Sequence, residues 1–189
     1  MQIRMEGHRI APPGAIEIVE RKGLGHPDTI CDHVSEKFSV ALSSYYLRQF
    51  GLVLHHNVDK ALLVGGAAEP AFGGGRILKP IEFYLSGRAT AAFEGHAVPI
   101  AEIAREVALS WLKENLHAFD IARGLTVHCL TKAGSPDLVE LFRRQRASGR
   151  FLANDTSIGA GFAPLSPLER MVLAVEQHLN APAFKAVHP

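Results

Sequence analysis

The stretch GLGHPDTICD, residues 23–32, decides where the first long helix of this chain begins. Gly23 and Gly25 interrupt the segment before it, and Pro27 suits a first helical position because its fixed φ angle already matches a helix. From there to about Phe50, apolar residues recur at steps of three and four, the spacing of one helical stripe: Ile30, Val34, Phe38, Ala41, Leu42 and Tyr45. We therefore predict a helix over 27–50 that begins at the His-Pro-Asp corner.

Other patterns predict the remaining elements. Alternating apolar residues favour strands at 15–21 and within 77–90, and the segment 125–131 is also strand-like. Apolar residues at helical spacing favour helices over 98–116 and 166–179, and Ser135 as N-cap with Pro136 as first helical residue favours a helix over 135–146. The helix over 166–179 opens with Ser166 and Glu169, the Ser-x-x-Glu pattern of a capping box. The glycine-rich stretch 61–75, with GGGR at 73–76, predicts turns and close backbone approach.

These elements interleave without regular strand–helix alternation, so we expect the α+β class. The polar-to-glycine stretch ENLHAFDIARG separates two groups of helix and strand. We place a domain boundary inside it, which divides the chain into residues 1–118 and 119–189.

Composition excludes several classes of function. The chain has 189 residues, 20 basic and 19 acidic side chains and a net charge of +1, so a broad basic face for nucleic acid is not expected. No stretch reaches the apolar length that crosses a bilayer, and MQIRMEGHRI lacks a signal-peptide core. Cys31 and Cys129 form no CxxC pair, which fits reduced thiols in a cytoplasmic protein.

The corner at 26–32 offers chemistry as well as a helix start. Asp28 and Asp32 lie one turn apart on a helix that begins at Pro27, and Asp28 is beside free N–H groups that favour negative charge. A carboxylate suits a hard cation and His26 can donate to phosphate, so together they could hold a magnesium–polyphosphate unit. The alternative is that Asp28 is an ordinary first-turn acid and His26 an ordinary loop histidine. Spacing alone leaves both open.

A second set of candidate ligands follows at His55, His56 and Asn57, with Asp59 next. Combined with the corner, these residues could indicate a zinc or manganese hydrolase. Adjacent histidines are more commonly exposed or singly hydrogen-bonded, and the chain has no HExxH motif. The polar stretch ANDTSIGAGFAPLS at 153–166 has the composition of either a ligand-contacting loop or a plain connection.

Six stretches in order resemble the archaeal-type methionine adenosyltransferases, also called S-adenosylmethionine synthetases. They are EIVERKGLGHPDTICD, FGLVLHHNVDKALLVGG, GGGRILKPI, LSGRAT, SPDLVELF and ANDTSIGAGFAPLSPLER, and they cover most of the chain from 15 to 180. The resemblance implies a transferase that makes S-adenosylmethionine from ATP and methionine and releases phosphate and pyrophosphate. It also implies a fold of three α+β units about a pseudo-threefold axis, of which this chain holds the first and part of the second.

The resemblance further implies roles for individual residues. His26 would contact the triphosphate, Asp28 would hold Mg²⁺, and Asp59 would help to bind a cation. The substrate-binding residues would be Asp137, Asn154, Asp155, Thr156 and Ser157. Expected cofactors are Mg²⁺ and, as a second cation, K⁺, with ATP as a substrate. Expected partners are ATP, L-methionine, and a second copy or a full-length subunit, because active sites in the family lie between subunits.

One departure keeps other functions open. Family members are much longer, and the part without a match here would supply most of the cations that neutralise tripolyphosphate. The chain could therefore represent a synthetase in part, or a non-catalytic truncated paralogue that binds nucleotide or pairs with a full-length subunit. The His/Asp metal-dependent hydrolase is the third hypothesis.

Overall fold

The computed structural model describes residues 16–116, 119–134, 144, 148–149 and 163–188. They belong to two compact units, a larger one within residues 22–158 and a smaller one formed by residues 1–21 and 159–188. In the larger unit the elements are α1 (Pro27–Phe50), β1 (His56–Val64), β2 (Ala67–Ala71), β3 (Gly74–Lys79), β4 (Ile81–Ala89), β5 (Ala92–Phe93), β6 (His96–Ala97), α2 (Ile100–Asn115), α3 (Ile121–Gly124) and β7 (Leu125–Cys129). The smaller unit contains α5 (Pro167–Asn180) and α6 (Pro182–Val187).

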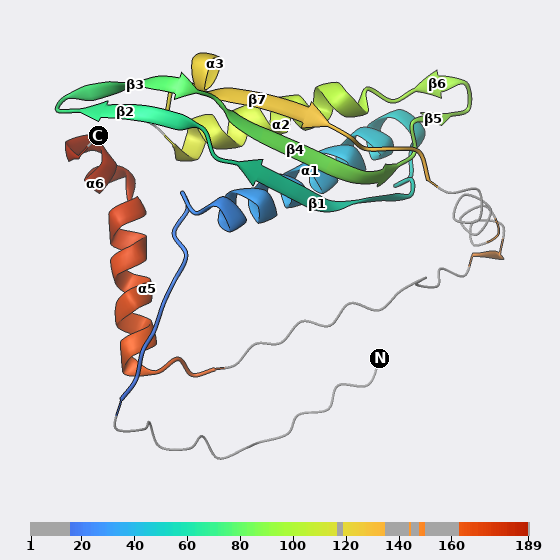
Figure 1. The fold of residues 1–189 in the computed structure, drawn as a ribbon. Helices are drawn as coiled ribbons and strands as arrows, with labels where there is room; N and C mark the ends of the chain where they lie inside the picture. The colour runs from blue at the N-terminus through green and yellow to red at the C-terminus, as the bar shows by residue number, and fades with distance from the viewer. Residues whose placement is uncertain (1–15, 117–118, 135–143, 145–147, 150–162, 189) are drawn as a thin grey trace. The chain divides into compact units, whose positions relative to one another are not determined.

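A three-stranded sheet in the order β1-β4-β7 organises the larger unit (Figure 1). β1 and β4 are antiparallel, whereas β4 and β7 are parallel. Parallel neighbours need a long crossover connection, and α2 lies in the connection between these two strands. The mixture of strands and helices confirms the predicted α+β class.

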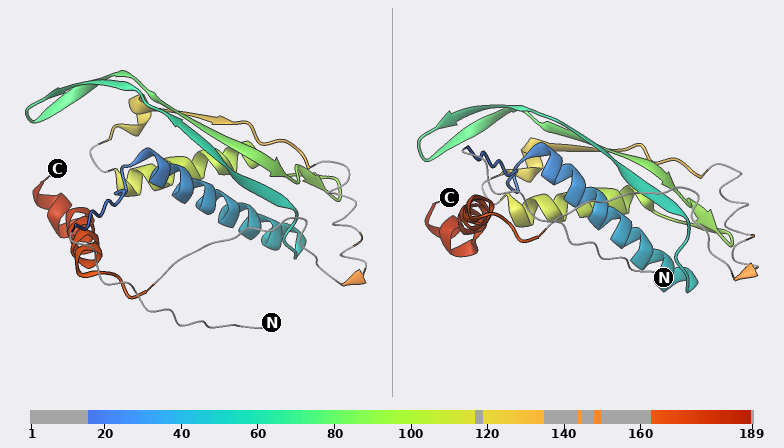
Figure 2. Two further views of the ribbon diagram at one scale, coloured as in Figure 1. Left: turned by 60° about the horizontal axis from the view of Figure 1, so that its bottom comes forward. Right: turned by 90° about the horizontal axis from the view of Figure 1, so that it is seen from below.

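Helices α1 and α2 cover one face of this sheet (Figure 2). The predicted helix over 27–50 is confirmed, with Pro27 in its first turn and Gly51 as its left-handed C-cap. The core between the two layers is apolar. It contains Ile30, Val34, Phe38, Leu42 and Tyr46 from α1, Val58, Phe83, Leu85 and Ala89 from the sheet, and Ala104, Ala108, Trp111 and Leu112 from α2. At the end of the α1 stripe the fully buried ring is Tyr46 rather than Tyr45.

The strand predicted within 77–90 is two strands. Pro80, which has no N–H to donate, separates β3 from β4. β2 and β3 form a hairpin, and GGGR at 73–76 contributes its turn and the start of β3, as the glycine pattern predicted. The predictions of a helix at 98–116 and a strand at 125–131 are confirmed by α2 and β7, both slightly shorter than predicted.

A β-bulge distorts β1 opposite Gly87. The register runs from Asn57 opposite Arg88 to Lys60 opposite Ser86, so two residues of β1 face one glycine of β4. Gly87 has a φ of 145°, and a Cβ at this position would lie 2.2 Å from the carbonyl oxygen of Asn57. Only glycine therefore permits this approach of the two strands.

In the smaller unit, the predicted helix at 166–179 is confirmed by α5. Its capping box is complete: the Glu169 N–H donates to Ser166 Oγ over 3.1 Å, and the Ser166 N–H donates to Glu169 Oε2 over 2.6 Å. None of its residues is buried, and Met171 and Val175 are more than half exposed.

The predicted strand at 15–21 is wrong. Residues 16–21 form no strand, and the alternating Ile16 and Ile18 are 83% and 89% exposed. Their segment contacts α5 through side chains instead, since Ser166 donates to Glu17 and Arg21 lies 3.4 Å from Glu176. Alternation alone does not make a strand where no sheet edge pairs with it.

The helix predicted over 135–146 lies outside the described residues. The boundary between residues 1–118 and 119–189, and the pseudo-threefold arrangement, stay predictions. β7, which follows that boundary in sequence, pairs with β4 in the sheet of the larger unit.

Candidate functional site

The His-Pro-Asp corner forms the start of α1. A bond from the His26 N–H to the carbonyl of Gly23, 3.0 Å long, closes the turn before the helix. His26 is the N-cap, and its Nδ1 accepts from the backbone N–H of Asp28 over 3.1 Å. In the neutral ring the hydrogen is therefore on Nε2, which remains a donor. The cap thus orients the imidazole and leaves one N–H for a ligand.

The Asp28 carboxylate is open to solvent, with 63% of its side chain exposed. Lys22 donates to its Oδ2, and this bond and charge hold the pKa of the Asp28 carboxyl below its usual value. The carboxylate is thus ionised at neutral pH and accessible from the side of the helix N-terminus.

These residues fit a magnesium–phosphate unit. Mg²⁺ prefers oxygen ligands and is commonly held by one or two carboxylates together with substrate phosphates and water. Asp28 supplies such an oxygen on a rigid helical turn, and the His26 Nε2–H is a donor for phosphate beside it. Among the residues that the structure describes, no group of three or more His, Cys, Asp or Glu side chains could hold a metal ion by itself.

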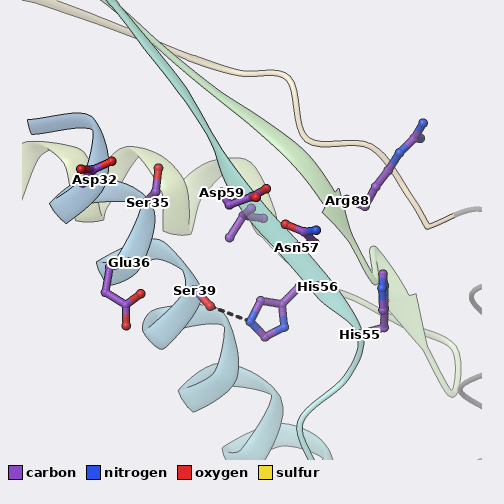
Figure 3. A pocket seen from close by; sticks show the side chains of 10 residues that line it. Asp32, Ser35, Glu36, Ser39, His55, His56, Asn57, Asp59 and Arg88 are labelled. Carbon is purple, nitrogen blue, oxygen red and sulfur yellow. Dashed lines mark hydrogen bonds between the residues drawn. The ribbon is translucent and has the colours of Figure 1, made fainter. Parts of the chain in front are cut away.

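A groove lies between α1 and β1 (Figure 3). Its volume is about 530 Å³, and it starts at Asp32, one helical turn beyond Asp28. The lining is mostly polar: Asp32, Ser35, Glu36 and Ser39 from α1, His55, His56, Asn57, Val58 and Asp59 from the segment of β1, and Arg88 from β4. The bulge opposite Gly87 lies at the same place, and Asp59 is one of the two β1 residues that face this glycine.

His56 links the two walls of this groove. Its Nδ1 lies 2.9 Å from the carbonyl of Leu54, which can only accept, so Nδ1 carries the hydrogen in the neutral ring. Its Nε2 then accepts from Ser39 Oγ over 3.0 Å (Figure 3). Ser43 Oγ lies 3.3 Å from the same nitrogen. Both ring nitrogens are engaged, so His56 holds α1 against β1.

The structure does not bring the hydrolase ligands together. His56 is bonded at Ser39, eleven residues along α1 from Asp28, which corresponds to roughly 16 Å of helix. His56 therefore lies too far along α1 from Asp28 to share one metal ion with it. Two effects lower the pKa of the His55 imidazole: burial is the larger, and the charge of His56 is the smaller.

Of the other predicted residues, Asp59 lines the groove and pairs with Lys60 over 2.6 Å. Asp137, Asn154, Asp155, Thr156 and Ser157 lie outside the described residues. Cys31 is half-buried and burial is the main cause that raises the pKa of its thiol, which agrees with a filler rather than a nucleophile.

Sequence reasoning missed two features of this region. One is Lys22, which precedes the glycines and pairs with Asp28. The other is the serine partnership of His56, although Ser35, Ser39 and Ser43 recur every four residues along α1 and so mark a polar stripe. This four-residue spacing is the pattern from which a polar contact on that face of α1 could have been predicted.

In the described part of the chain, no helix is both long and apolar enough to cross a membrane.

Comparisons with known proteins agree on one family. A family model described as S-adenosylmethionine synthetase (AdoMet synthetase) matches residues 2–189. A protein of Aquifex aeolicus named probable S-adenosylmethionine synthase is 56% identical over 174 residues, covering 92% of this chain and 44% of the relative. The S-adenosylmethionine synthases of Pyrococcus furiosus and Saccharolobus solfataricus are 44% and 46% identical, with 92% of this chain and 43% and 44% of theirs covered. The chain thus spans less than half the length of these relatives.

Proposed function

Because the chain belongs to the S-adenosylmethionine synthetase family, we propose that it serves in the synthesis of S-adenosylmethionine from ATP and L-methionine. The observation that carries this proposal is the corner at the start of α1. There a helix N-terminus, an imidazole donor at His26 and an exposed carboxylate at Asp28 come together.

The reaction needs little acid–base chemistry. The methionine sulfur already carries a nucleophilic lone pair and attacks the ribose 5′ carbon, which breaks the bond to the tripolyphosphate oxygen. Water then cleaves tripolyphosphate into phosphate and pyrophosphate. The main barrier is the charge that develops on the leaving group, so positioning and electrostatics should supply most of the catalysis.

The residues of the corner suit that task. The His26 Nε2–H would donate to a phosphate oxygen, and the N-cap bond from Asp28 keeps the ring in the required orientation. The Asp28 carboxylate would hold Mg²⁺, which neutralises phosphate charge when bound. The positive end of the α1 dipole favours the same anion.

The finer assignments are also part of the proposal. Asp137 and residues 154–157 would contact the adenosine and methionine, and Asp59 would help to bind a cation, with K⁺ as the candidate. We further propose a cytoplasmic protein that acts as a homodimer or beside a full-length subunit, built on the pseudo-threefold plan of its family.

The alternative that the sequence offers is a nucleotide-binding subunit without turnover of its own. This alternative predicts ATP binding at the same corner.

The deciding measurement is the conversion of radioactive methionine and ATP into S-adenosylmethionine by the purified chain. It is run alone and with the Pyrococcus furiosus synthase, after that enzyme's own rate is subtracted. Product from the chain alone supports the synthetase and rejects the non-catalytic subunit. Tightly bound zinc, no turnover and no nucleotide binding would reject both candidates in favour of the hydrolase.

A further inference from the structure

Lys22 lies beside the proposed phosphate site without any role in the function described so far. The turn closed by the His26 N–H and the Gly23 carbonyl brings it back toward the first turn of α1. Its ammonium group donates to Asp28 Oδ2, the carboxylate assigned to Mg²⁺. Both side chains are accessible, with 50% of Lys22 and 63% of Asp28 exposed.

We propose that Lys22 exchanges partners when the substrate binds: it pairs with Asp28 in the empty site and binds a phosphate oxygen once Asp28 holds Mg²⁺. This inference rests on the proposed function of the corner. It assigns Lys22 as a phosphate-binding cation. It also means that the Lys22–Asp28 ion pair regulates when Asp28 can bind a metal ion.

The physical basis is competition for one carboxylate. An exposed ion pair between Lys and Asp contributes little stability, so a divalent ion can displace the ammonium at small cost. The displaced group is a point charge on a flexible four-carbon stem, which can reach a new anion without backbone movement. Phosphate oxygens bound to the same Mg²⁺ would be the nearest strong acceptors.

The exchange has two consequences for the site. Without nucleotide, Lys22 weakens the binding of free divalent ions to Asp28, so the metal arrives together with the triphosphate. With nucleotide, Lys22 adds positive charge where the leaving group becomes more negative.

The test separates metal binding from anion binding. Mn²⁺ replaces Mg²⁺ and is titrated by electron paramagnetic resonance into the 189-residue chain, and tripolyphosphate is titrated calorimetrically in the presence of Mg²⁺. In Lys22→Met, Mn²⁺ alone should bind about fivefold tighter, whereas tripolyphosphate should bind about tenfold weaker. Lys22→Arg, which keeps the charge, should remain close to the native chain in both titrations.

Arg76→Gln is the matched control, because it removes an exposed ion pair with Glu69 in the β2–β3 hairpin. It should change neither titration, and circular dichroism checks that each variant is folded. Opposite shifts in the two titrations support the exchange. Shifts in the same direction, no shift, or a native chain that binds neither probe would overturn it for this chain.

Asp28→Asn distinguishes this inference from the proposed function. If Asp28→Asn abolishes both binding events while Lys22→Met is silent, the Lys22 role alone is wrong. If Asp28→Asn leaves both intact, the proposed function of the corner is wrong as well.

Discussion

The inward face of α1 and its N-terminal corner belong to the same helix but do different work. Ile30, Val34, Phe38, Leu42 and Tyr46 are at most 3% exposed and form the centre of the core. Asp28, at the start of the helix, is 63% exposed, and its carboxylate accepts from Lys22. Folding stability and ligand chemistry are therefore separated along one element, and substitutions in the two places should have separable effects.

The largest effect is expected in the core. Phe38→Ala should lower the free energy of unfolding by about 3–5 kcal/mol, because it leaves a cavity between α1 and the sheet. Urea denaturation measures this change. Val40→Ala is the control on the same helix, since Val40 is 51% exposed, and it should cost less than about 0.5 kcal/mol. Equal losses from both variants would contradict the separation.

The corner should show the reverse pattern. Asp28→Asn should reduce S-adenosylmethionine production by about 100-fold, in whichever form of the protein turns over, because the metal–triphosphate contact is lost. Its urea midpoint should stay close to that of the native chain. Near-normal turnover in this variant would remove the role assigned to the carboxylate.

His26 allows its two roles to be separated. His26→Ala should cost about 1 kcal/mol of stability because α1 loses its N-cap, whereas Asn at this position caps well. His26→Asn should therefore keep the stability, but its amide N–H groups lie closer to the backbone than Nε2–H, so tripolyphosphate binding should weaken in both variants. Calorimetry gives the affinity and urea denaturation the stability. Native affinity in His26→Asn would show that tripolyphosphate binding does not need a donor at the Nε2 position.

The smallest effect concerns Tyr46 and pH. Its hydroxyl donates to the Thr90 carbonyl over 3.0 Å, so Tyr46→Phe should be about 1 kcal/mol less stable at pH 7. Burial raises the pKa of Tyr46 from 10 to about 12. Because the folded pKa is the higher one, its contribution is complete below pH 10 and is lost as pH rises toward 12. The stability gap between native chain and variant should thus shrink as the pH rises from 10 toward 12, measured by urea denaturation at each pH. A constant gap would contradict this assignment.

Sequence reasoning succeeded where a pattern and its partner were both local. The apolar stripe of α1, its Pro27 start and the capping box of α5 all depend on residues within a few turns. It failed where the partner was distant. β1 was not recognised as a strand because of its bulge. The bulge leaves two consecutive residues, Asp59 and Lys60, exposed, and this interrupts the alternation of buried and exposed residues. Ile16 and Ile18 show a period of two, but no strand among the residues that the structure describes pairs with them.

The candidate site divides in the same way. His26 and Asp28 were found from their helix start, and their metal and phosphate roles came from a family resemblance that composition could not supply. The pairing of His56 with Ser39, seventeen residues apart, depends on how α1 packs against β1. The pairing of Lys22 with Asp28 depends on a turn whose closure was not predicted.

Gly87 shapes the groove without contributing a side chain to its lining. Since a single methyl group there would collide with the Asn57 backbone, an alanine would act as a wedge between the middle strand and its neighbour. The added methyl group would change or shift the β-bulge that orients Asp59, and the polar residues of β1 that line the groove would move with it. The orientation of Asp59 on β1 therefore depends on the absence of a side chain at Gly87 on β4.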